Sequence, residues 1–531
     1  MCEVTTKNFK LILPQLKEVL KAAKFISLDT EFSCLTASRK FENSLFDSGN
    51  ERYAKLRATV EQMIPLQIGL SAFIFDPDNN SYKAHVYTFY IFPRSFTYID
   101  VKFLCQSSSL QFLNAYNFNF NKLINEGISY LNRTQEEEII KRNGDFTVTE
   151  SSMRSETENL LEENIRIINE WFADANVDDL LILESVEKVQ FNLEIKYFLH
   201  KELRYKFKKL LWTYEDEQGF KVQKVTTEQF EILSKKFSLD QTLIADLLGF
   251  SEIFRLLTTL QKPIIGHNLL LDLMVITHSF ERPLPKSYAA FKKLVHSLFP
   301  NIYDTKCISF DINNLIPENK RLHQNILSTL YEYFKDGYGR HLAKNSPLIE
   351  HVSDTQQMFH YAGWDAYCTG YIFIRMAHIY ASERYNKVKG KKFMSSELLQ
   401  AVEKHRNNVN IIRGDVSHIR LDGDDPVSRR PPWLIIETKN KPINVNQVTS
   451  LLGMYGYVEV KPHSFKGRSA IIAVDNFGSA RRILRQFNSH SDFKIQQYNP
   501  LKHSPVAGAV LWSSFLISGI VLAWYGYSKI K

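Results

Sequence analysis

Three apolar runs in the first part of the chain alternate with polar segments in the manner of β-strands. They span residues 24–32 (KFISLDTEF), 63–75 (MIPLQIGLSAFIF) and 86–92 (VYTFYIF), and all are rich in β-branched and aromatic residues. The pattern predicts one sheet within a mixed α/β segment, residues 1–145. Residues 146–245 are more polar and predict an insert, largely helical, with the basic, aromatic stretch IKYFLHKELRYKFKKLLW. Strand and helix signals resume over residues 246–385.

A second periodic pattern follows a stretch that is typical of a linker. Residues 386–432 end in DGDDPVSRRPP, whose proline, glycine and charge content indicates a connecting segment. Residues 433–500 then show strands at 434–438, 457–461, 470–474 and 493–498 and helices at 445–455 and 477–487. This order, βαββαβ, predicts a small α/β module of the RRM type.

Residues 504–528 contain no charged side chain and no histidine, and basic residues flank them on both sides. As an α-helix these 25 residues would extend roughly 38 Å, enough to cross a hydrocarbon layer of about 30 Å. Residues 1–25 hold five lysines and no apolar block of signal-peptide length. The pattern therefore predicts a transmembrane tail anchor with the catalytic part in the cytosol, at the mitochondrial outer membrane or, alternatively, at the endoplasmic reticulum.

The composition is that of an ordinary globular protein. Of the 531 residues 44% are hydrophobic and 23% charged, which excludes a disordered, collagen-like or coiled-coil chain and suggests two to four domains. The formal net charge of +8 permits a nucleic-acid partner without proving one. Five widely spaced cysteines form no CxxC pair, which argues against a disulfide framework or a zinc knuckle and favours a reducing compartment.

Two carboxylates stand two positions apart on the first predicted strand. Asp29 and Glu31 project from one face of the strand, while Leu28, Thr30 and Phe32 alternate to the other. One face of the sheet thus gains two hard oxygen ligands. Acidic pairs on strands are common, so this pair alone does not indicate a metal site.

A third acid interrupts an apolar stretch, KPIIGHNLLLDLMVIT. The short strand ends at Gly266, Asn268 is a candidate helix cap, and Asp272 is the one acid of the stretch. A buried carboxylate is costly unless it is paired or binds a cation. Asp272 therefore either faces solvent from its helix or serves as a ligand.

A fourth acid follows a histidine in the segment HYAGWDAYCTG. Five positions subtend about 140° on a helix, so His360 and Asp365 would not share a helix face. The small residues Ala362 and Gly363 predict that His360 belongs to the preceding turn and folds back over Asp365. A lone histidine is more often structural, so neither residue indicates a function by itself.

Together the four acids and the histidine form a specific constellation. Two carboxylates on a strand and one on each of two helices can hold two divalent cations about 3.5 to 4 Å apart. Two Mg²⁺ ions are the expected cofactor, with Mn²⁺ as the alternative. One ion would activate a water, the other would stabilise a leaving 3′ oxygen, and neutral His360 would act as a general base near pH 7.

The motifs D-x-E, IGHNxLLD and HxAGxDAYxTG resemble the DEDDh exonucleases and, within them, the poly(A)-specific ribonuclease (PARN) family. The resemblance covers roughly residues 1–385 and extends weakly to 500, through ERYAKLR (51–57), FLCQSSSLQFL (103–113), GISYLN (127–132) and FPNIYDTK (299–306). It implies a ribonuclease-H-like core, a mixed sheet with flanking helices, formed by residues 1–145 and 246–385. It also implies Asp29, Glu31, Asp272 and Asp365 as metal ligands and His360 as the base.

Other parts of the resemblance are incomplete. Lys306 would touch a substrate phosphate, and Phe32 would lie near the terminal base. The family's insert resembles a small nucleic-acid-binding module marked by Arg-x-x-x-His, but here Lys196 and His200 occupy those positions, so the module is degenerate. The RRM-like module offers one aromatic in WLIIET (433–438) and none in GRSAIIAV (467–474), so a structural role is as well supported as RNA binding.

The leading hypothesis is a metal-dependent 3′–5′ exoribonuclease that shortens single-stranded RNA with a free 3′ hydroxyl and releases 5′-nucleotides. The uncharged C-terminal segment resembles the membrane-anchored PARN-like branch, which implies piRNA precursors as substrates, PIWI proteins and a Tudor-type scaffold as partners, and allows a homodimer. Alternatives within the class are a poly(A) deadenylase of mRNA tails and a DNA exonuclease, because two-metal chemistry does not depend on the 2′ hydroxyl. An inactive, membrane-tethered RNA-binding scaffold is the alternative from another class, which the complete set of acids disfavours.

Overall fold

The structure is a computed structural model of the 531-residue chain. It describes residues 2–96, 99–141, 151–189, 193–216, 218–342, 345–351, 358–385, 391–438, 441–463, 467–487, 492–503, 513, 516–518 and 520. The chain divides into two compact units. Unit 1 comprises residues 1–42, 54–410 and 420–424, and unit 2 comprises residues 43–53, 411–419 and 425–531.

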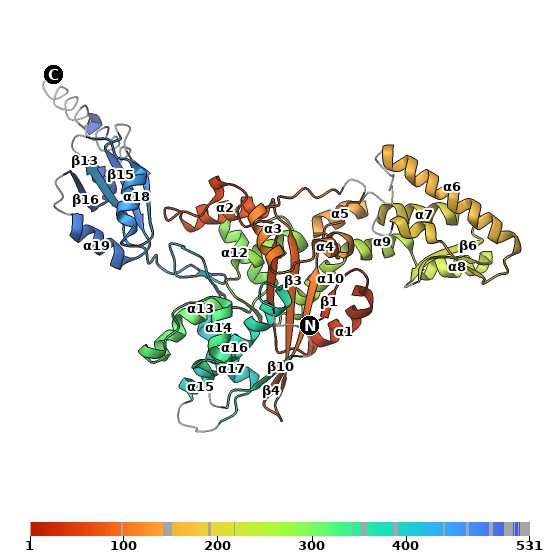
Figure 1. Cartoon of the computed structure of the whole chain (residues 1–531), viewed down its shortest axis with the longest axis horizontal. Helices are drawn as coiled ribbons and strands as arrows, with labels where there is room; N and C mark the ends of the chain where they lie inside the picture. The colour runs from red at the N-terminus through yellow and green to blue at the C-terminus, as the bar shows by residue number, and fades with distance from the viewer. Residues whose placement is uncertain are drawn as a thin grey trace, which may run out of the picture. The chain divides into compact units, whose positions relative to one another are not determined.

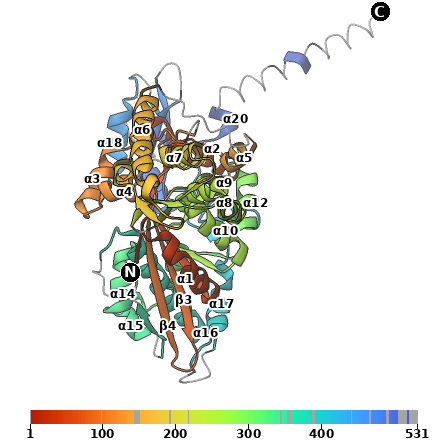
Figure 2. The same cartoon turned by 90° about the vertical axis from the view of Figure 1, so that its right-hand side faces the viewer.

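A seven-stranded mixed sheet forms the centre of unit 1 (Figure 1). Its path is β1-β4-β3-β2-β8-β9, and β10 also pairs with β4. Strands β2, β3 and β4 are joined antiparallel, whereas β8 extends the sheet parallel to β2 and β9 parallel to β8. The two longest strands, β3 and β4, run side by side in Figure 2. The strands are β1 (Cys2–Val4), β2 (Phe25–Phe32), β3 (Pro65–Asp76), β4 (Ser81–Tyr90), β8 (Ile264–Gly266), β9 (Ile302–Asp304) and β10 (Leu348–His351).

This strand order confirms the predicted α/β core of the ribonuclease-H-like type. Three consecutive strands form the antiparallel half, and strands that arrive by crossover connections continue the sheet from the first of them. The three apolar runs correspond to β2, β3 and β4, of which β4 begins five residues earlier than its run. The short strands β1 and β10 were not predicted, because three or four residues carry too little alternation to be recognised.

Helix α16 (Ala362–Arg384) packs against this sheet and is buried along most of its length. The rings of Phe25 and Phe73 stack with their centroids 4.7 Å apart, and Phe373 of α16 meets Phe25 at 5.3 Å. Tyr367 of α16 lies parallel to Phe73 at 6.2 Å. These aromatic contacts join the helix to the sheet at the base of the core.

Other helices cover the remaining sides of α16, which explains why most of its residues are buried. Helix α14 (Leu327–Lys335) and helix α17 (Ser395–Ala401) both pack on it. Helix α17 falls within residues 386–432, the stretch predicted to be a linker, and its Leu398 belongs to the same hydrophobic core. The further helices of unit 1 outside the insert are α1 (Phe9–Ala22), α2 (Gly49–Val60, shared with unit 2), α3 (Ser107–Ala115), α4 (Phe120–Glu126), α5 (Arg133–Lys141), α10 (Phe250–Leu260), α11 (Leu270–Ile276), α12 (Tyr288–Leu298), α13 (Thr305–Ile312) and α15 (Gly339–Leu342).

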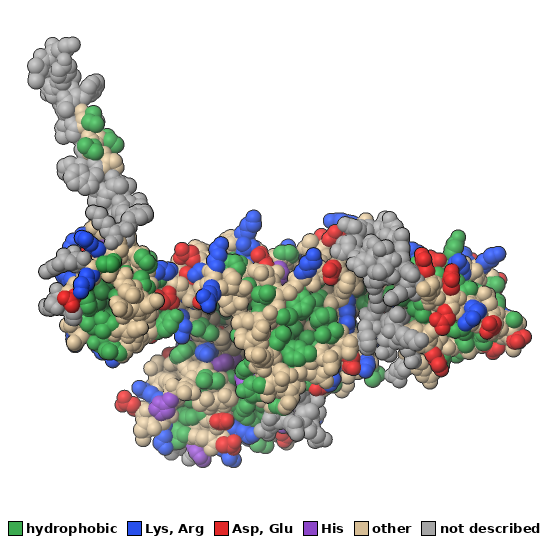
Figure 3. All heavy atoms as spheres, turned by 45° about the horizontal axis from the view of Figure 1, so that its top comes forward, with side chains coloured by type: hydrophobic (Ala, Val, Ile, Leu, Met, Phe, Trp, Pro, Cys, Tyr) green, Lys and Arg blue, Asp and Glu red, His purple; other side chains and the backbone are tan. Residues whose placement is uncertain are grey.

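The predicted insert forms a small three-stranded sheet of order β5-β7-β6 with helices beside it and a hydrophobic core of its own. Acidic and basic side chains are interspersed on the face of the molecule drawn in Figure 3, on the right where the insert lies. Its elements are α6 (Ser151–Asp174), β5 (Leu180–Ile182), α7 (Leu193–Lys206), β6 (Leu211–Asp216), β7 (Gly219–Lys224), α8 (Thr227–Lys236) and α9 (Leu239–Leu248). The boundaries predicted for the insert and for the other domains stay predictions.

Unit 2 contains a four-stranded antiparallel sheet of order β14-β15-β13-β16, with helices α18 (Val445–Gly453) and α19 (Phe477–Phe487) on one face. The strands are β13 (Leu434–Thr438), β14 (Val458–Pro462), β15 (Ser469–Val474) and β16 (Phe493–Gln497), and α20 (Pro500–His503) follows them. The elements stand in the order βαββαβ, close to the predicted residues. Membership of the RRM type itself stays a prediction.

The predicted tail anchor requires a correction. Within the described part of the chain, no helix is both long enough and apolar enough to cross a membrane. The two described helices of 18 residues or more, α6 and α16, both carry several charged side chains. The structure therefore does not support a tail-anchored protein at a mitochondrial or endoplasmic reticulum membrane, and most of residues 504–528 lie outside the described residues.

Candidate active site

Strand β2 presents Asp29 and Glu31 on the face of the sheet that meets helix α16. Both residues are partly exposed, whereas Leu28 and Thr30 are buried. Ser27, on the same side of the strand as the two acids, donates its hydroxyl to the carbonyl oxygen of Ala366 in α16 at 2.6 Å. The period of two along a strand therefore directs both acids towards α16.

Gly69 on the neighbouring strand allows α16 to approach the sheet closely. It pairs with Asp29, and a Cβ at this position would lie 1.8 Å from the carbonyl oxygen of Ala362 and 2.5 Å from the nitrogen of Gly363. Gln67, the partner of Glu31, accepts the Ala362 N–H through its side-chain oxygen at 3.1 Å. The first turn of α16 is thus fixed directly against the strands that carry and flank the two acids.

Three carboxylates meet at this junction. One carboxylate oxygen from each of Asp29, Glu31 and Asp365 lies within 4.8 Å of the other two. Oδ2 of Asp365 accepts the His360 N–H at 3.0 Å, while its buried Oδ1 has no hydrogen-bond partner among the described residues. A buried carboxylate oxygen without a donor is costly in itself and is well suited to bind a cation.

The fourth acid, Asp272, is buried in the first turn of α11. Burial raises the pKa of Asp272, and the charge of Asp29 raises it further. The charge of Asp272 in turn raises the pKa of Glu31. Asp272 therefore belongs to the electrostatic neighbourhood of the other three acids. The structure brings Asp29, Glu31 and Asp365 together and places Asp272 near enough for the charges to act on one another.

Asp304, at the end of β9, fixes the start of α11. Its Oδ1 accepts the N–H groups of Asn268 and Lys306, both at 2.9 Å, and its Oδ2 accepts those of Leu269 at 3.0 Å and Asn410 at 2.9 Å. Asn268 has a left-handed backbone with φ of 63° and does not cap the helix, which has no side-chain cap. The predicted cap was wrong because Asp304, 36 residues away, anchors these N–H groups instead.

Burial raises the pKa of each of the four acids and so favours their neutral forms. Burial raises the pKa of Asp29 to about 7. Burial raises the pKa of Glu31 well above its usual range, and the charges of Asp29, Asp365 and Asp272 raise it further. Burial raises the pKa of Asp365 as well, and the charge of Asp29 raises it further. A cation would favour the ionised form of each acid, and hard carboxylate oxygens are the ligands that Mg²⁺ and Mn²⁺ prefer, so the residues fit a divalent metal site.

His360 lies in the turn before α16, two residues ahead of the first helical position. Its backbone is left-handed, with φ of 65°, a conformation that is uncommon for a residue with a side chain and that clusters at functional sites. The imidazole packs against Phe112 and Tyr116, with ring centroids 4.7 and 4.3 Å away. Partial burial lowers the pKa of His360, so the ring is neutral near pH 7 and can accept a proton.

Comparison with known proteins adds to this geometry. Residues 4–373 match the family described as CAF1 family ribonuclease. The chain belongs to this ribonuclease family. It is 32% identical to the Bombyx mori protein named pre-piRNA 3′-exonuclease trimmer, over 100% of this chain and 99% of that protein. It is 30% identical to the Mus musculus poly(A)-specific ribonuclease PNLDC1, over 98% of both chains, and 28% identical to the Homo sapiens poly(A)-specific ribonuclease PARN, over 93% of this chain and 80% of that protein.

These relatives confirm that the chain is a 3′–5′ exoribonuclease, and they confirm its predicted place beside the PARN and pre-piRNA trimmer proteins. Among solved structures, Pop2p of S. pombe in its Mg²⁺- and Mn²⁺-bound form covers 72% of this chain and 93% of that chain, with a TM-score of 0.34 and 15% identity. At this TM-score the similarity supports no conclusion about the reaction.

The residues predicted to contact substrate lie at the margin of the ribonuclease's carboxylate cluster. Phe32 ends β2, where the pairing with β3 shifts register, and is partly exposed. Lys306 is the second residue of α13 and lies near His267, whose pKa is lowered to about 3 by burial and then by the charge of Lys306. Neither position contradicts a substrate contact, and both roles stay predictions.

In the insert of the ribonuclease, the two residues of the degenerate nucleic-acid motif contact the same acid. Lys196 forms an ion pair with Glu215 of β6, and His200 Nε2 lies 3.5 Å from the other carboxylate oxygen. The second nitrogen of His200 lies 2.7 Å from the hydroxyl oxygen of Thr213. Burial raises the pKa of Glu215, but the hydrogen bond with His200 and the charge of Lys196 outweigh it and lower the pKa to about 2. The structure thus uses these side chains to join α7 to β6.

Three residues at the site were missed by the sequence analysis. Phe112 and Tyr116 flank His360 but carry only the ordinary pattern of a surface helix and the turn after it, so no signal could have found them. Asp304 had a signal, because an acid directly after a buried strand and before a helix is a typical N-cap, and its side chain does accept the Lys306 N–H. Its further hydrogen bonds to Asn268, Leu269 and Asn410 could not be read from the sequence.

Proposed function

We propose that this exoribonuclease trims the 3′ ends of piRNA precursors, with Asp29, Glu31, Asp272 and Asp365 holding two divalent ions and His360 acting as the general base. The observation that carries the metal site is the meeting of three carboxylates within 4.8 Å beside a neutral histidine. The choice of substrate is supported by the 32% identity to the Bombyx mori trimmer over the whole chain. Mg²⁺ is the ion we assign, with Mn²⁺ able to replace it.

In this mechanism the four carboxylates bind the metal ions, and a pair of divalent cations supplies Lewis-acid stabilisation of the charge that gathers on the scissile phosphate. His360 removes the proton of the attacking water through its unprotonated ring nitrogen. The water oxygen bonds to phosphorus, the bond from phosphorus to the 3′ oxygen of the preceding nucleotide breaks, and a 5′-nucleotide leaves. The backbone N–H of His360 donates to the Asp365 carboxylate, and this hydrogen bond fixes the base relative to one ligand.

The aromatic rings beside His360 offer a surface for the RNA end. Phe112 is 43% exposed and Tyr116 is 38% exposed, although both pack on the histidine. Bases stack on exposed aromatic rings without regard to sequence, which suits an enzyme that removes successive nucleotides. We therefore assign the 3′-terminal base to these rings, with Phe32 at the end of β2 as a further contact.

The test is the shortening of a 5′-labelled single-stranded RNA by the purified full-length protein. Asp29→Asn and Asp365→Asn should abolish shortening while the melting temperature stays near the wild-type value or rises, because each removes a charge from a crowded cluster. Asp78→Asn, in an exposed turn, is the matched control and should leave the rate unchanged. Shortening at the wild-type rate in either cluster variant would refute the assignment.

The second candidate is the poly(A) deadenylase activity named in the PARN relatives, which are 28% to 29% identical to this chain. The two activities differ in substrate, so RNAs with an oligo(A) end and with a mixed-sequence end distinguish them. Equal shortening of both favours the trimmer, and strict dependence on terminal adenosines favours the deadenylase. A PIWI protein that holds the precursor, a Tudor-type scaffold and a homodimer belong to the trimmer proposal as its predicted partners.

A further inference from the structure

The sheet of unit 2 has one face that its helices do not cover. Leu434, Ile436, Val460 and Ile472 point to the side of α18 and α19 and form the core there. Because side chains alternate along a strand, Ile435 and its neighbours point to the opposite side. In modules of βαββαβ order that bind single-stranded RNA, bases stack on this opposite face.

The middle of this opposite face is nevertheless buried, although Trp433 at its margin is 39% exposed. Ile435 of β13 and Ala473 of β15 are each only 1% exposed. Ile435 pairs with Ile471, and Ala473 pairs with Glu459 of β14, so these residues occupy the middle of the sheet. Something other than α18 and α19 must therefore cover them.

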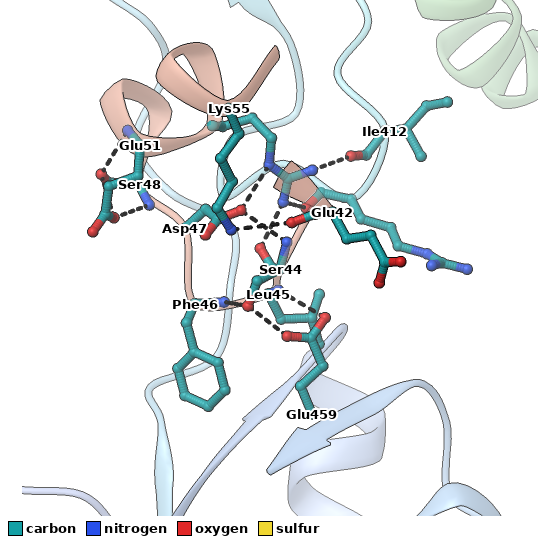
Figure 4. Close-up of polar contacts among 12 residues, drawn as sticks. Glu42, Ser44, Leu45, Phe46, Asp47, Ser48, Glu51, Lys55, Ile412 and Glu459 are labelled. Atoms are coloured by element: carbon teal, nitrogen blue, oxygen red, sulfur yellow. Dashed lines mark hydrogen bonds and ion pairs between the residues drawn. The ribbon is translucent and has the colours of Figure 1, made fainter. Parts of the chain in front are cut away.

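Residues 43–53, which we call the docked segment, contact this side of the sheet, and so do Tyr498 and His503 from the end of the module. The segment groups with unit 2 although it lies near the N-terminus of the sequence. Glu459 accepts the Leu45 N–H at 3.0 Å through one oxygen and the Ser44 hydroxyl at 2.5 Å through the other, as Figure 4 shows. Leu45 itself is 2% exposed. A single carboxylate thus holds both the backbone and a side chain of the segment.

Aromatic contacts add to these hydrogen bonds. The ring of Phe46 meets the ring of Trp433 edge-on, with centroids 5.4 Å apart. The ammonium of Lys461 lies 4.4 Å from the centre of the Phe46 ring, within the range of a cation–π contact. Trp433 is the aromatic that the sequence offered for base stacking, and the docked segment already occupies its neighbourhood.

Arg52 secures the segment from its other end. It is 2% exposed and donates from its Nη atoms to the carbonyl oxygens of Ser44 at 2.6 Å, Ile412 at 2.9 Å and Arg413 at 3.0 Å. Its Nε lies 3.3 Å from the carboxylate of Asp47, which also accepts the Ser44 N–H at 2.8 Å. The Nε of Arg52 makes no hydrogen bond among the described residues, so the guanidinium holds the segment through its Nη donors and its charge beside Asp47.

We propose that the sheet face of the C-terminal module is a docking surface for residues 43–53 of its own chain, and that this occupancy keeps RNA off the face. The occupant is defined by its chemistry: a serine hydroxyl and a backbone N–H for Glu459, and a phenylalanine ring for Trp433 and Lys461. The segment begins eleven residues after β2, the strand of Asp29 and Glu31.

Hydrogen exchange of the full-length protein tests the docking without reference to activity. Glu459→Ala removes both acceptors and should speed exchange of the Leu45 amide about tenfold or more, because a hydrogen bond to a charged group is lost. Phe46→Ala changes the segment and leaves the module intact, and it should speed exchange over residues 44–46 as well. Glu437→Ala removes a carboxylate from the same face, where it accepts a hydrogen bond from the Gln496 side chain, and is the matched control. Equal exchange of Leu45 in all four proteins would overturn the docking.

Photo-crosslinking tests the exclusion of RNA. Full-length Asp29→Asn protein is irradiated with single-stranded RNA that contains 4-thiouridine, and the crosslinked peptides are mapped. The proposal expects no crosslinks to residues 433–438 or 469–474 in this protein and their appearance after the additional Glu459→Ala change. Crosslinks to these strands while the segment is still protected from exchange would overturn the exclusion and would restore the module as an RNA-binding surface. Because the exchange measurement needs no RNA, a failure of the proposed trimming activity would not be mistaken for a failure of the docking.

Discussion

Gly69→Ala tests whether the close approach of α16 to the sheet sets the geometry of the carboxylate cluster. The added methyl group would stand 1.8 Å from the Ala362 carbonyl oxygen, whereas ordinary contact begins at 3.4 Å. The first turn of α16 would therefore have to move by about 1.6 Å, the difference between these two distances. Asp365 lies in that turn and would move away from Asp29 and Glu31.

A displacement of about 1 Å can cost about 100-fold in rate when reacting groups must be aligned. We therefore expect Gly69→Ala to shorten 5′-labelled RNA at least about 100-fold more slowly than wild type. Gly453→Ala is the matched control, because a Cβ there meets nothing within 4 Å, and it should keep the wild-type rate. Circular dichroism and thermal melting check that the variant still folds. A folded Gly69→Ala protein with wild-type activity would refute the view that the α16 contact sets the cluster.

Further predictions concern the surroundings of the cluster and the insert. Asp304→Asn keeps one of the two acceptor oxygens and leaves two buried N–H groups unpaired, so denaturant unfolding should show a loss of about 2 to 6 kcal/mol; an unchanged midpoint would contradict its anchoring role. The double change Phe112→Ala with Tyr116→Ala should raise KM for RNA about tenfold or more by removing stacking, whereas Phe310→Ala, which removes a more exposed aromatic ring elsewhere, should not. Glu215 has a pKa of about 2, below its ordinary 4.5, so its ionised form stabilises the insert above about pH 4.5 and this contribution is lost as the pH falls towards 2. Glu215→Gln should therefore lower the melting temperature more at pH 6 than at pH 3, and an equal loss at both would rule out the linkage.

Much of the nuclease core could be predicted, because its chemistry follows local periodicity. The alternation along β2 placed Asp29 and Glu31 on one face without any knowledge of α16. The small residues Ala362 and Gly363 indicated that His360 precedes the helix, and the structure has it there. What linked the acids into one site was the set of residue types and their order, because an acid in an apolar stretch needs a cation or hydrogen-bond donors as its partner.

The features that could not be predicted depend on contacts distant in the sequence. Nothing near Asn268 shows that Asp304 would take its N–H group, and a side chain that satisfies backbone groups leaves no periodic signal. The same reason hid the docked segment, because Ser44 and Leu45 look like an ordinary polar loop. The membrane prediction failed for a different reason: it relied on composition alone, and the described helices do not include an apolar span.

The contact between Ser44 and Glu459 joins residues that are 415 positions apart. At about 5 to 20 residues per second, a ribosome needs roughly 20 to 80 s to pass from one to the other. Leu45 and Phe46 thus leave the ribosome long before the sheet that buries them exists. A nascent chain therefore carries Leu45 and Phe46 without their partners Glu459 and Trp433 through most of its synthesis.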